Sequence, residues 1–141
     1  MLRQGAIAAG AGLFGLVFAA GFLLGTIREL ALRPLLGADP ARLLELPVMI
    51  AVSWLSSRWI VRRAGTGSAL WQLEVGLIAF LLLMAAEMAL GILILGRSLS
   101  AFIADLFTLT GMLSFLAQAL LIVMPRLAAS VTGSSHGRTA P

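Results

Sequence analysis

Residue types that carry much of protein chemistry are missing or nearly missing from this sequence: cysteine, lysine and tyrosine do not occur, and histidine occurs once. The absence of cysteine excludes disulfides, thiol nucleophiles, iron–sulfur clusters and cysteine-ligated zinc, and the absence of lysine excludes Schiff-base chemistry. The single histidine, His136, lies in a polar stretch near the C-terminus, which leaves too little for a haem ligand or a catalytic triad. We therefore expect a protein that is not an enzyme, with no catalytic residues, no metal site and no cofactor.

Charge is scarce as well. Charged residues make up 11% of the 141 residues and hydrophobic residues 60%, against about 25% and about 45–50% in ordinary soluble domains. This composition predicts an integral membrane protein whose first partner is the lipid bilayer. The net charge is +4, but the arginines lie at the ends of apolar runs rather than in a cluster with aromatic residues, so we expect no nucleic-acid partner.

The apolar runs are long enough for four spanning helices, each of which needs about 20 residues. We predict an all-α fold, an integral membrane bundle of four transmembrane helices within residues 1–128, followed by a polar, disordered tail at 129–141. Pro34 and Pro40 indicate a short amphipathic connection after the first helix, and Pro125 is expected to stop the last one. The predicted helices are residues 5–32, 46–63, 70–95 and 102–124.

The first apolar run is longer than the core of a cleaved signal peptide, about 7–15 residues, so we expect it to be retained. An even number of spans places both termini on one side of the membrane. Six arginines then share that side and four the other. The positive-inside rule therefore predicts a multi-pass membrane protein with both termini in the cytoplasm.

Small residues line one side of the first helix, where they would let another helix approach closely. They are Ala8, Gly12, Gly15 and Ala19, followed by the GxxxG pair Gly21 and Gly25. This face could be the seam of a dimer, or it could pack against the protein's own helices. We favour packing within the chain, because GxxxG is common in membrane helices.

The segment LLLMAAEMALGILI places one carboxylate, Glu87, deep inside the third predicted helix. A charge at that depth costs about 2.5–3.5 kcal/mol on insertion scales, so Glu87 must be protonated, paired or facing a wet cavity. Arg28 and Glu45 approach the membrane from the same side, and we expect Arg28 to bridge Glu45 and Glu87. Glu87 is therefore either a proton or cation site or part of a buried ion pair or hydrogen bond that fixes helix packing, and both interpretations stay open.

The fourth predicted helix carries a weak polar stripe at a spacing of four residues, formed by Thr110, Ser114 and Gln118. It could line a small polar passage, but hydrogen bonds between helices are the more common role of such residues. Two further acids are expected to form ordinary pairs. Asp105 is expected to pair with Arg97, and Glu74 with Arg62 or Arg63.

The stretches GTIRELALRPLLG, LLELPVMI and SRWIVRR, between Gly25 and Arg63, resemble small four-helix inner-membrane proteins of bacteria that have no assigned activity. The resemblance implies the same four-helix architecture and a location in the bacterial inner membrane, and it supplies no substrate or site residue. The characteristic residues of small multidrug transporters and of dual-topology fluoride channels have no counterparts in the sequence.

Two functions follow from these observations. The first is a non-enzymatic accessory or assembly subunit that packs against other membrane proteins. The second is a small proton- or cation-coupled transporter or channel that works as a homo-oligomer, with Glu87 as its coupling site. We favour the first, because catalytic residue types are few and one face of the first helix suits close packing.

Overall fold

The computed structural model describes residues 4–134, and every element within that range is a helix. The predicted all-α class is therefore confirmed. The elements, in chain order, are α1 (Gln4–Ile27), the π-helix η1 (Arg28–Leu32), α2 (Arg33–Leu36), α3 (Ala38–Ala64), α4 (Ala69–Leu93), α5 (Leu99–Leu106), α6 (Leu109–Ala119), the 3-10 helix η2 (Leu120–Ile122) and α7 (Met124–Ser134).

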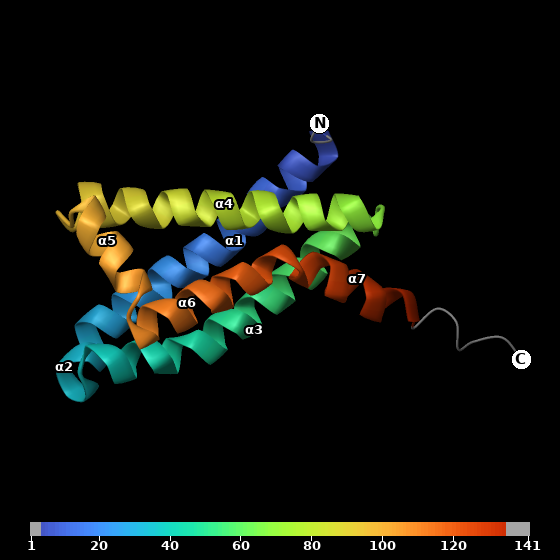
Figure 1. Ribbon diagram of the computed structural model, residues 1–141. Helices are drawn as coiled ribbons and strands as arrows, with labels where there is room; N and C mark the ends of the chain where they lie inside the picture. Colours follow the sequence, from blue (N-terminus) through green and yellow to red (C-terminus); the bar gives the residue numbers. More distant parts are fainter. Residues whose placement is uncertain (1–3, 135–141) are drawn as a thin grey trace, which may run out of the picture.

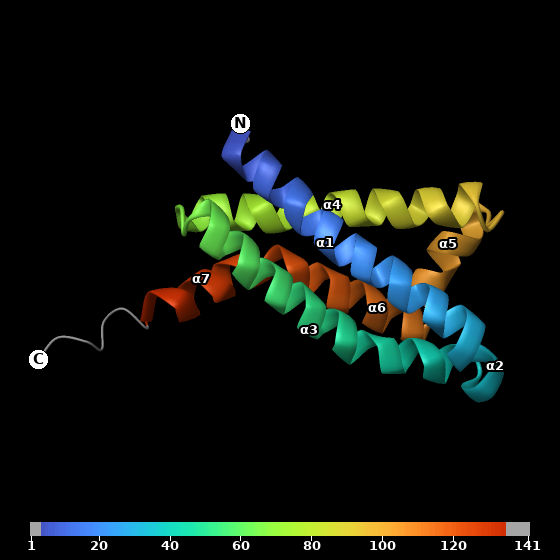
Figure 2. The same ribbon diagram turned by 180° about the vertical axis from the view of Figure 1, so that it is seen from behind.

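The long helices lie side by side as an elongated bundle with two distinct ends (Figure 1). We call one the Gly37 end: it holds the turn at Gly37 between α2 and α3, the end of α4, the short helix α5 and the start of α6. We call the other the Gly65 end: it holds the start of α1, the turn around Gly65 between α3 and α4, and α7. Figure 2 shows from behind how α1 crosses α4 and lies against α3.

Three helical runs are long and apolar enough to cross a membrane: Gln4–Leu36, Ala38–Ala64 and Ala69–Leu93. A fourth crossing exists if α5 and the α6–η2 segment, which meet at a bend of 85°, count as one broken span. The number of candidate spans is therefore three or four. The third predicted helix agrees closely with α4, which begins after Ser68, whose hydroxyl caps the helix by accepting from the Trp71 N–H.

The predicted connection at residues 33–45 is wrong, because most of it is helical. Helix α1 continues through η1 and α2, and α3 already begins at Ala38. Pro40 lies in the first turn of α3, where a missing N–H removes no helical hydrogen bond. Pro34 lies inside the continuous helical run Gln4–Leu36, directly after the π-helix η1, and removes one backbone donor from that run without ending it. The chain turns at Gly37 alone, with φ of 90°, a conformation that glycine adopts without steric cost.

The predicted last helix, 102–124, is also wrong. The chain bends at residues 107–108, between α5 and α6, and Pro125 lies in the first turn of α7 instead of ending a helix. Helix α7 continues to Ser134, so the first six residues of the predicted tail are helical. Ala128 and Ala129 hold this segment by packing against Val61 of α3. Residues 135–141, the rest of the predicted tail, and His136 lie outside the described residues.

The apolar core lies in the half of the bundle nearer the Gly65 end. Gly10 of α1 and Gly76 of α4 permit its closest approaches: a Cβ on Gly10 would lie 2.7 Å from the Ile78 Cβ, and one on Gly76 would lie 2.2 Å from the carbonyl oxygen of Ile122. Helices α1 and α4 run in the same direction here. The buried core residues are Ala6, Ala9, Leu13, Val17, Ile60, Trp71, Val75, Ala79, Leu83, Leu121 and Met124.

Candidate functional site

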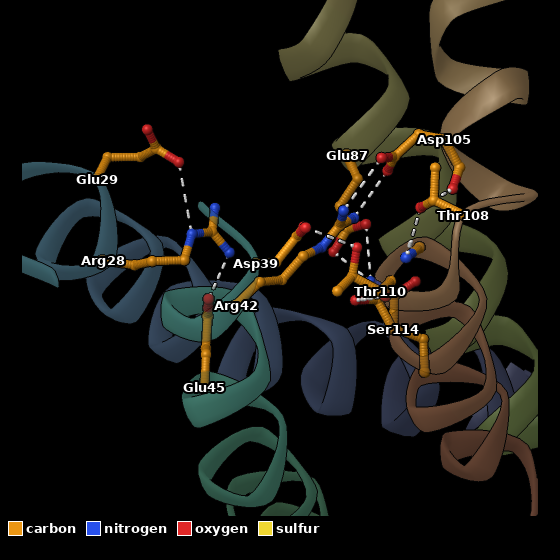
Figure 3. A network of polar contacts seen from close by, with 12 residues as sticks. Arg28, Glu29, Asp39, Arg42, Glu45, Glu87, Asp105, Thr108, Thr110 and Ser114 are labelled. Atoms are coloured by element: carbon orange, nitrogen blue, oxygen red, sulfur yellow. Dashed lines mark hydrogen bonds and ion pairs between the residues drawn. The ribbon is translucent and has the colours of Figure 1, made fainter. Parts of the chain in front are cut away.

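Five of the six acidic residues gather in the half of the bundle nearer the Gly37 end (Figure 3). They are Glu29, Asp39, Glu45, Glu87 and Asp105. Arginines from η1, α2 and α3 lie among them, so this half of the molecule contains a network of opposite charges and hydrogen bonds.

Arg28, in η1, donates a hydrogen bond to Glu45 of α3, and its Nε lies 3.5 Å from Glu29 Oε1. Arg33 pairs with the other oxygen of Glu29 at 2.7 Å. The expected contact between Arg28 and Glu45 is therefore present. The expected bridge from Arg28 to Glu87 is absent from the described structure, because Glu45 and Glu29 already occupy the Arg28 guanidinium.

Glu87 of α4 is hydrogen-bonded to α6 instead. The Gln118 Nε2 lies 2.7 Å from one carboxylate oxygen of Glu87 and 2.8 Å from the other. Glu87 therefore faces an uncharged amide, while the charges that act on it from neighbouring elements are Arg42 and Glu45 of α3 and Arg28 of η1. The sequence offered both Glu87 and Gln118 as candidates, but spacing within each helix does not tell how α4 is rotated towards α6.

Two side chains from the first turns of α3 contact the chain on either side of the 85° bend between α5 and α6. Arg42 makes a forked contact with Asp105, at the end of α5, through N–O distances of 3.2 and 2.9 Å. Asp39 accepts a hydrogen bond of 3.1 Å from Thr110, at the start of α6. The predicted pair of Asp105 with Arg97 is wrong, because the folded chain brings α3 rather than the preceding turn against Asp105.

The bend itself is built from Thr108 and Gly111. The Thr108 hydroxyl donates to the Asp105 carbonyl at 2.7 Å and accepts from the Gly111 N–H at 3.0 Å, which caps the start of α6. A Cβ on Gly111 would lie 1.8 Å from the Asp105 carbonyl oxygen, so the bend requires glycine at this position. Threonine is a residue type that commonly caps helices, but the capping role of Thr108 was missed in the sequence.

The polar stripe of α6 is used mainly for contacts between helices. Thr110 bonds to Asp39 and Gln118 to Glu87, whereas Ser114 donates to the Thr110 carbonyl within its own helix at 2.8 Å. A groove of about 460 Å³ between α3 and α6 is lined by apolar side chains, among them Leu46 and Leu116. The stripe therefore links helices and does not line that groove.

The chemistry open to this network is the exchange of protons and hydrogen bonds. Within residues 4–134, no group of three or more Asp, Glu, His or Cys side chains is placed to hold a metal ion. Glu29, Glu45 and Asp105 each face arginine. Glu87 differs from them because its hydrogen-bond partner carries no charge.

The predicted packing face of the first helix packs only in part against the chain's own helices: a Cβ on Gly12 would lie 3.2 Å from the Ile60 Cδ1 of α3, whereas one on Gly15 would meet no atom within 4 Å. Ala8, Gly12, Gly15 and Ala19 are exposed, and the opposite face of α1 is buried. Helix α1 is apolar on all sides, so the spacing of small residues could not tell which face turns inward. The other two residues of the predicted face are half-buried: Gly21 lies next to Met49, and Gly25 next to the Arg28 guanidinium.

The remaining acid, Glu74, lies near the Gly65 end. The predicted pair with Arg62 or Arg63 does not form in the part of the chain that the structure describes, and the Glu74 Oε2 is buried with no hydrogen-bond partner there. Arg62 and Arg63 are exposed, and Arg63 instead stacks over Trp59 at 4.9 Å from the ring centroid. An exposed arginine beside an aromatic ring gains a cation–π contact without leaving water.

No protein-family model matches this chain, and no significant match is found among curated proteins or among solved structures.

Proposed function

We propose that this chain is a multi-pass protein of the bacterial inner membrane, without enzymatic activity, that acts as an accessory or assembly subunit packed against other membrane proteins or against itself. Its long apolar helices and their many exposed leucines support placement in a bilayer. The arginines near the Gly65 end support an orientation with both termini in the cytoplasm.

The observation that carries the proposal is the outward face of α1 formed by Ala8, Gly12, Gly15 and Ala19. Association of helices in lipid depends on close van der Waals contact, which small residues permit. A Cβ on Gly15 would meet no atom of the chain within 4 Å, so this position faces outward without a neighbour. A helix of another subunit, or of a second copy, would fit against this face.

The experiment is purification from native membranes in a gentle detergent, followed by native mass analysis, for the wild type, Gly15→Ile and Ala85→Ile. Both substitutions add the same kind of bulk at exposed positions, one on the small-residue face and one on α4. We expect a foreign subunit or a second copy at fixed stoichiometry, lost in Gly15→Ile and kept in Ala85→Ile. A wild-type chain that purifies as a monomer without partners would disprove the proposal.

A second candidate function is proton- or cation-coupled transport by a homo-oligomer, with Glu87 as the coupling site. It is supported by the bond between Glu87 and the uncharged Gln118, which leaves this carboxylate without the direct arginine partner that Glu45 has. Proton flux into liposomes that contain purified protein tests this function. Flux that Glu87→Gln abolishes and Glu29→Gln preserves would support transport, and an absence of flux from the wild-type protein would count against it.

A further inference from the structure

The described arginines of the Gly65 end are not neutralised by the chain. They lie in the last two turns of α3 and in the first turn of α7: Arg58, Arg62, Arg63 and Arg126. Within residues 4–134 none of them lies within ion-pair distance of an acidic side chain, and Glu74, near the same end, has a buried carboxylate oxygen without a partner.

Arg58 adds a second observation. It precedes Arg62 by one helical turn, so both side chains leave α3 on one side. Its Nε is buried and finds no hydrogen-bond acceptor in the described structure. A buried donor normally has a partner, so the described chain leaves the Arg58 guanidinium incompletely bonded.

The surface around these arginines is apolar on the side towards the middle of the bundle. Leu55 is 61% exposed and Trp59 49% exposed, directly before Arg62 and Arg63 along α3. Tryptophan beside arginine is typical of the level at which lipid headgroups meet hydrocarbon. A ligand for this surface therefore needs an anionic group for the arginines and an apolar part for Leu55 and Trp59.

We infer that the Gly65 end binds the phosphate groups of anionic phospholipids, with Arg58, Arg62 and Arg63 as the main contacts and Arg126 beside them. The planar guanidinium matches phosphate oxygens through two parallel hydrogen bonds. The acyl chains of the same lipid cover the exposed apolar residues of α3. This inference rests on the membrane placement proposed above, but it does not depend on an accessory role or on transport.

The test is native mass analysis of the purified chain titrated with phosphatidylglycerol or phosphatidylcholine of identical acyl chains. We expect the anionic lipid to bind at lower concentration. In the double variant Arg62→Gln/Arg63→Gln, the ratio of the affinity for phosphatidylglycerol to that for phosphatidylcholine should fall about 25-fold, at about fivefold for each arginine removed. The single variant Arg58→Gln reports separately on the half-buried donor and should also weaken binding.

The matched control is Arg33→Gln/Arg97→Gln, which removes two exposed arginines from the Gly37 end. It should leave the lipid preference unchanged. Equal binding of the two lipids by the wild type, an equal loss in the control variant, or binding of inorganic phosphate as tight as that of phosphatidylglycerol would each overturn the inference. All three outcomes are separate from whether partner subunits copurify with the chain.

Discussion

Arginines at the Gly37 end, apart from Arg97, each face a carboxylate, whereas the arginines at the Gly65 end face none within the described chain. The apolar core shows the opposite distribution, because its buried residues lie in the half nearer the Gly65 end. One half of the bundle is therefore joined by ion pairs and hydrogen bonds between side chains. The other half is joined by backbones that approach closely at glycine.

The difference indicates how each half should respond to substitution. Close backbone contacts do not tolerate added atoms, because neither backbone can move without moving its helix. Ion pairs tolerate changes in size but not the loss of one partner, which leaves a poorly solvated charge behind. The exposed arginines of the Gly65 end take part in neither kind of contact, so removing them should leave the fold intact.

The largest effect is expected from Gly76→Ala. The new Cβ would lie 2.2 Å from the carbonyl oxygen of Ile122 and would separate α4 from η2. We expect a loss of about 3 kcal/mol in the free energy of unfolding, measured by reversible denaturation in mixed micelles.

Gly91→Ala is the matched control, because it lies in the same helix and its Cβ would meet no atom within 4 Å. It should be neutral or stabilising by up to about 1 kcal/mol, since alanine is the better helix former. Equal effects of the two substitutions would contradict close packing at Gly76.

A smaller loss, about 2 kcal/mol, is expected from Arg28→Gln, which leaves Glu45 without its cation. The Glu45 side chain is 11% exposed, so water replaces little of the lost interaction. The double variant Arg28→Gln/Glu45→Gln should recover most of the stability, measured in the same denaturation assay. Arg33→Gln, which breaks an exposed pair with Glu29, should cost less than about 1 kcal/mol. No recovery in the double variant would show that the pair does not join η1 to α3.

A smaller effect than that of Arg28→Gln is expected from Asp105→Asn, which weakens the fork from Arg42 while leaving the Asp39 contact in place. Both side chains are partly exposed, at 23% and 30%, so we expect a loss of about 1 kcal/mol. Cysteine labelling at Phe107, introduced as Phe107→Cys in both backgrounds, should be faster in the variant if the bend loosens. Unchanged labelling and stability would mean that Thr108 and Gly111 hold the bend alone.

A helix was predictable where the sequence itself marks the residues at which the helix begins and ends. Helix α4 follows a continuous apolar run between a capping serine, Ser68, and a glycine at positive φ, Gly96. The bend at residues 107–108 was not predictable from hydropathy, because apolar residues continue through it. Proline was misleading, because Pro40 and Pro125 lie in first helical turns, where proline is tolerated, and the helical run Gln4–Leu36 continues through Pro34.

The candidate site was predictable in its members but not in all its pairings. Arg28 and Glu45 lie on either side of one turn, so their contact follows from a helical hairpin. Glu87 and Gln118 come from helices that are distant along the chain, and their contact depends on how each helix is rotated. Rotation also decides the contacts of α1, where Gly10 faces Ile78 of α4 and Gly12 faces Ile60 of α3.

Helix α1 packs in parallel against α4, which comes later in the chain, so the contacts between helices form in a fixed order during synthesis. The contact between Arg28 and Glu45 can form once α3 has been synthesised, but Gly10 meets Ile78 only after α4 is complete. The stretch from Ala64 to Leu93 takes on the order of a few seconds to synthesise at about 5–20 residues per second. During that delay the inner face of α1 has no partner from α4. In the membrane placement proposed above, this face would be open to other helices until α4 is inserted.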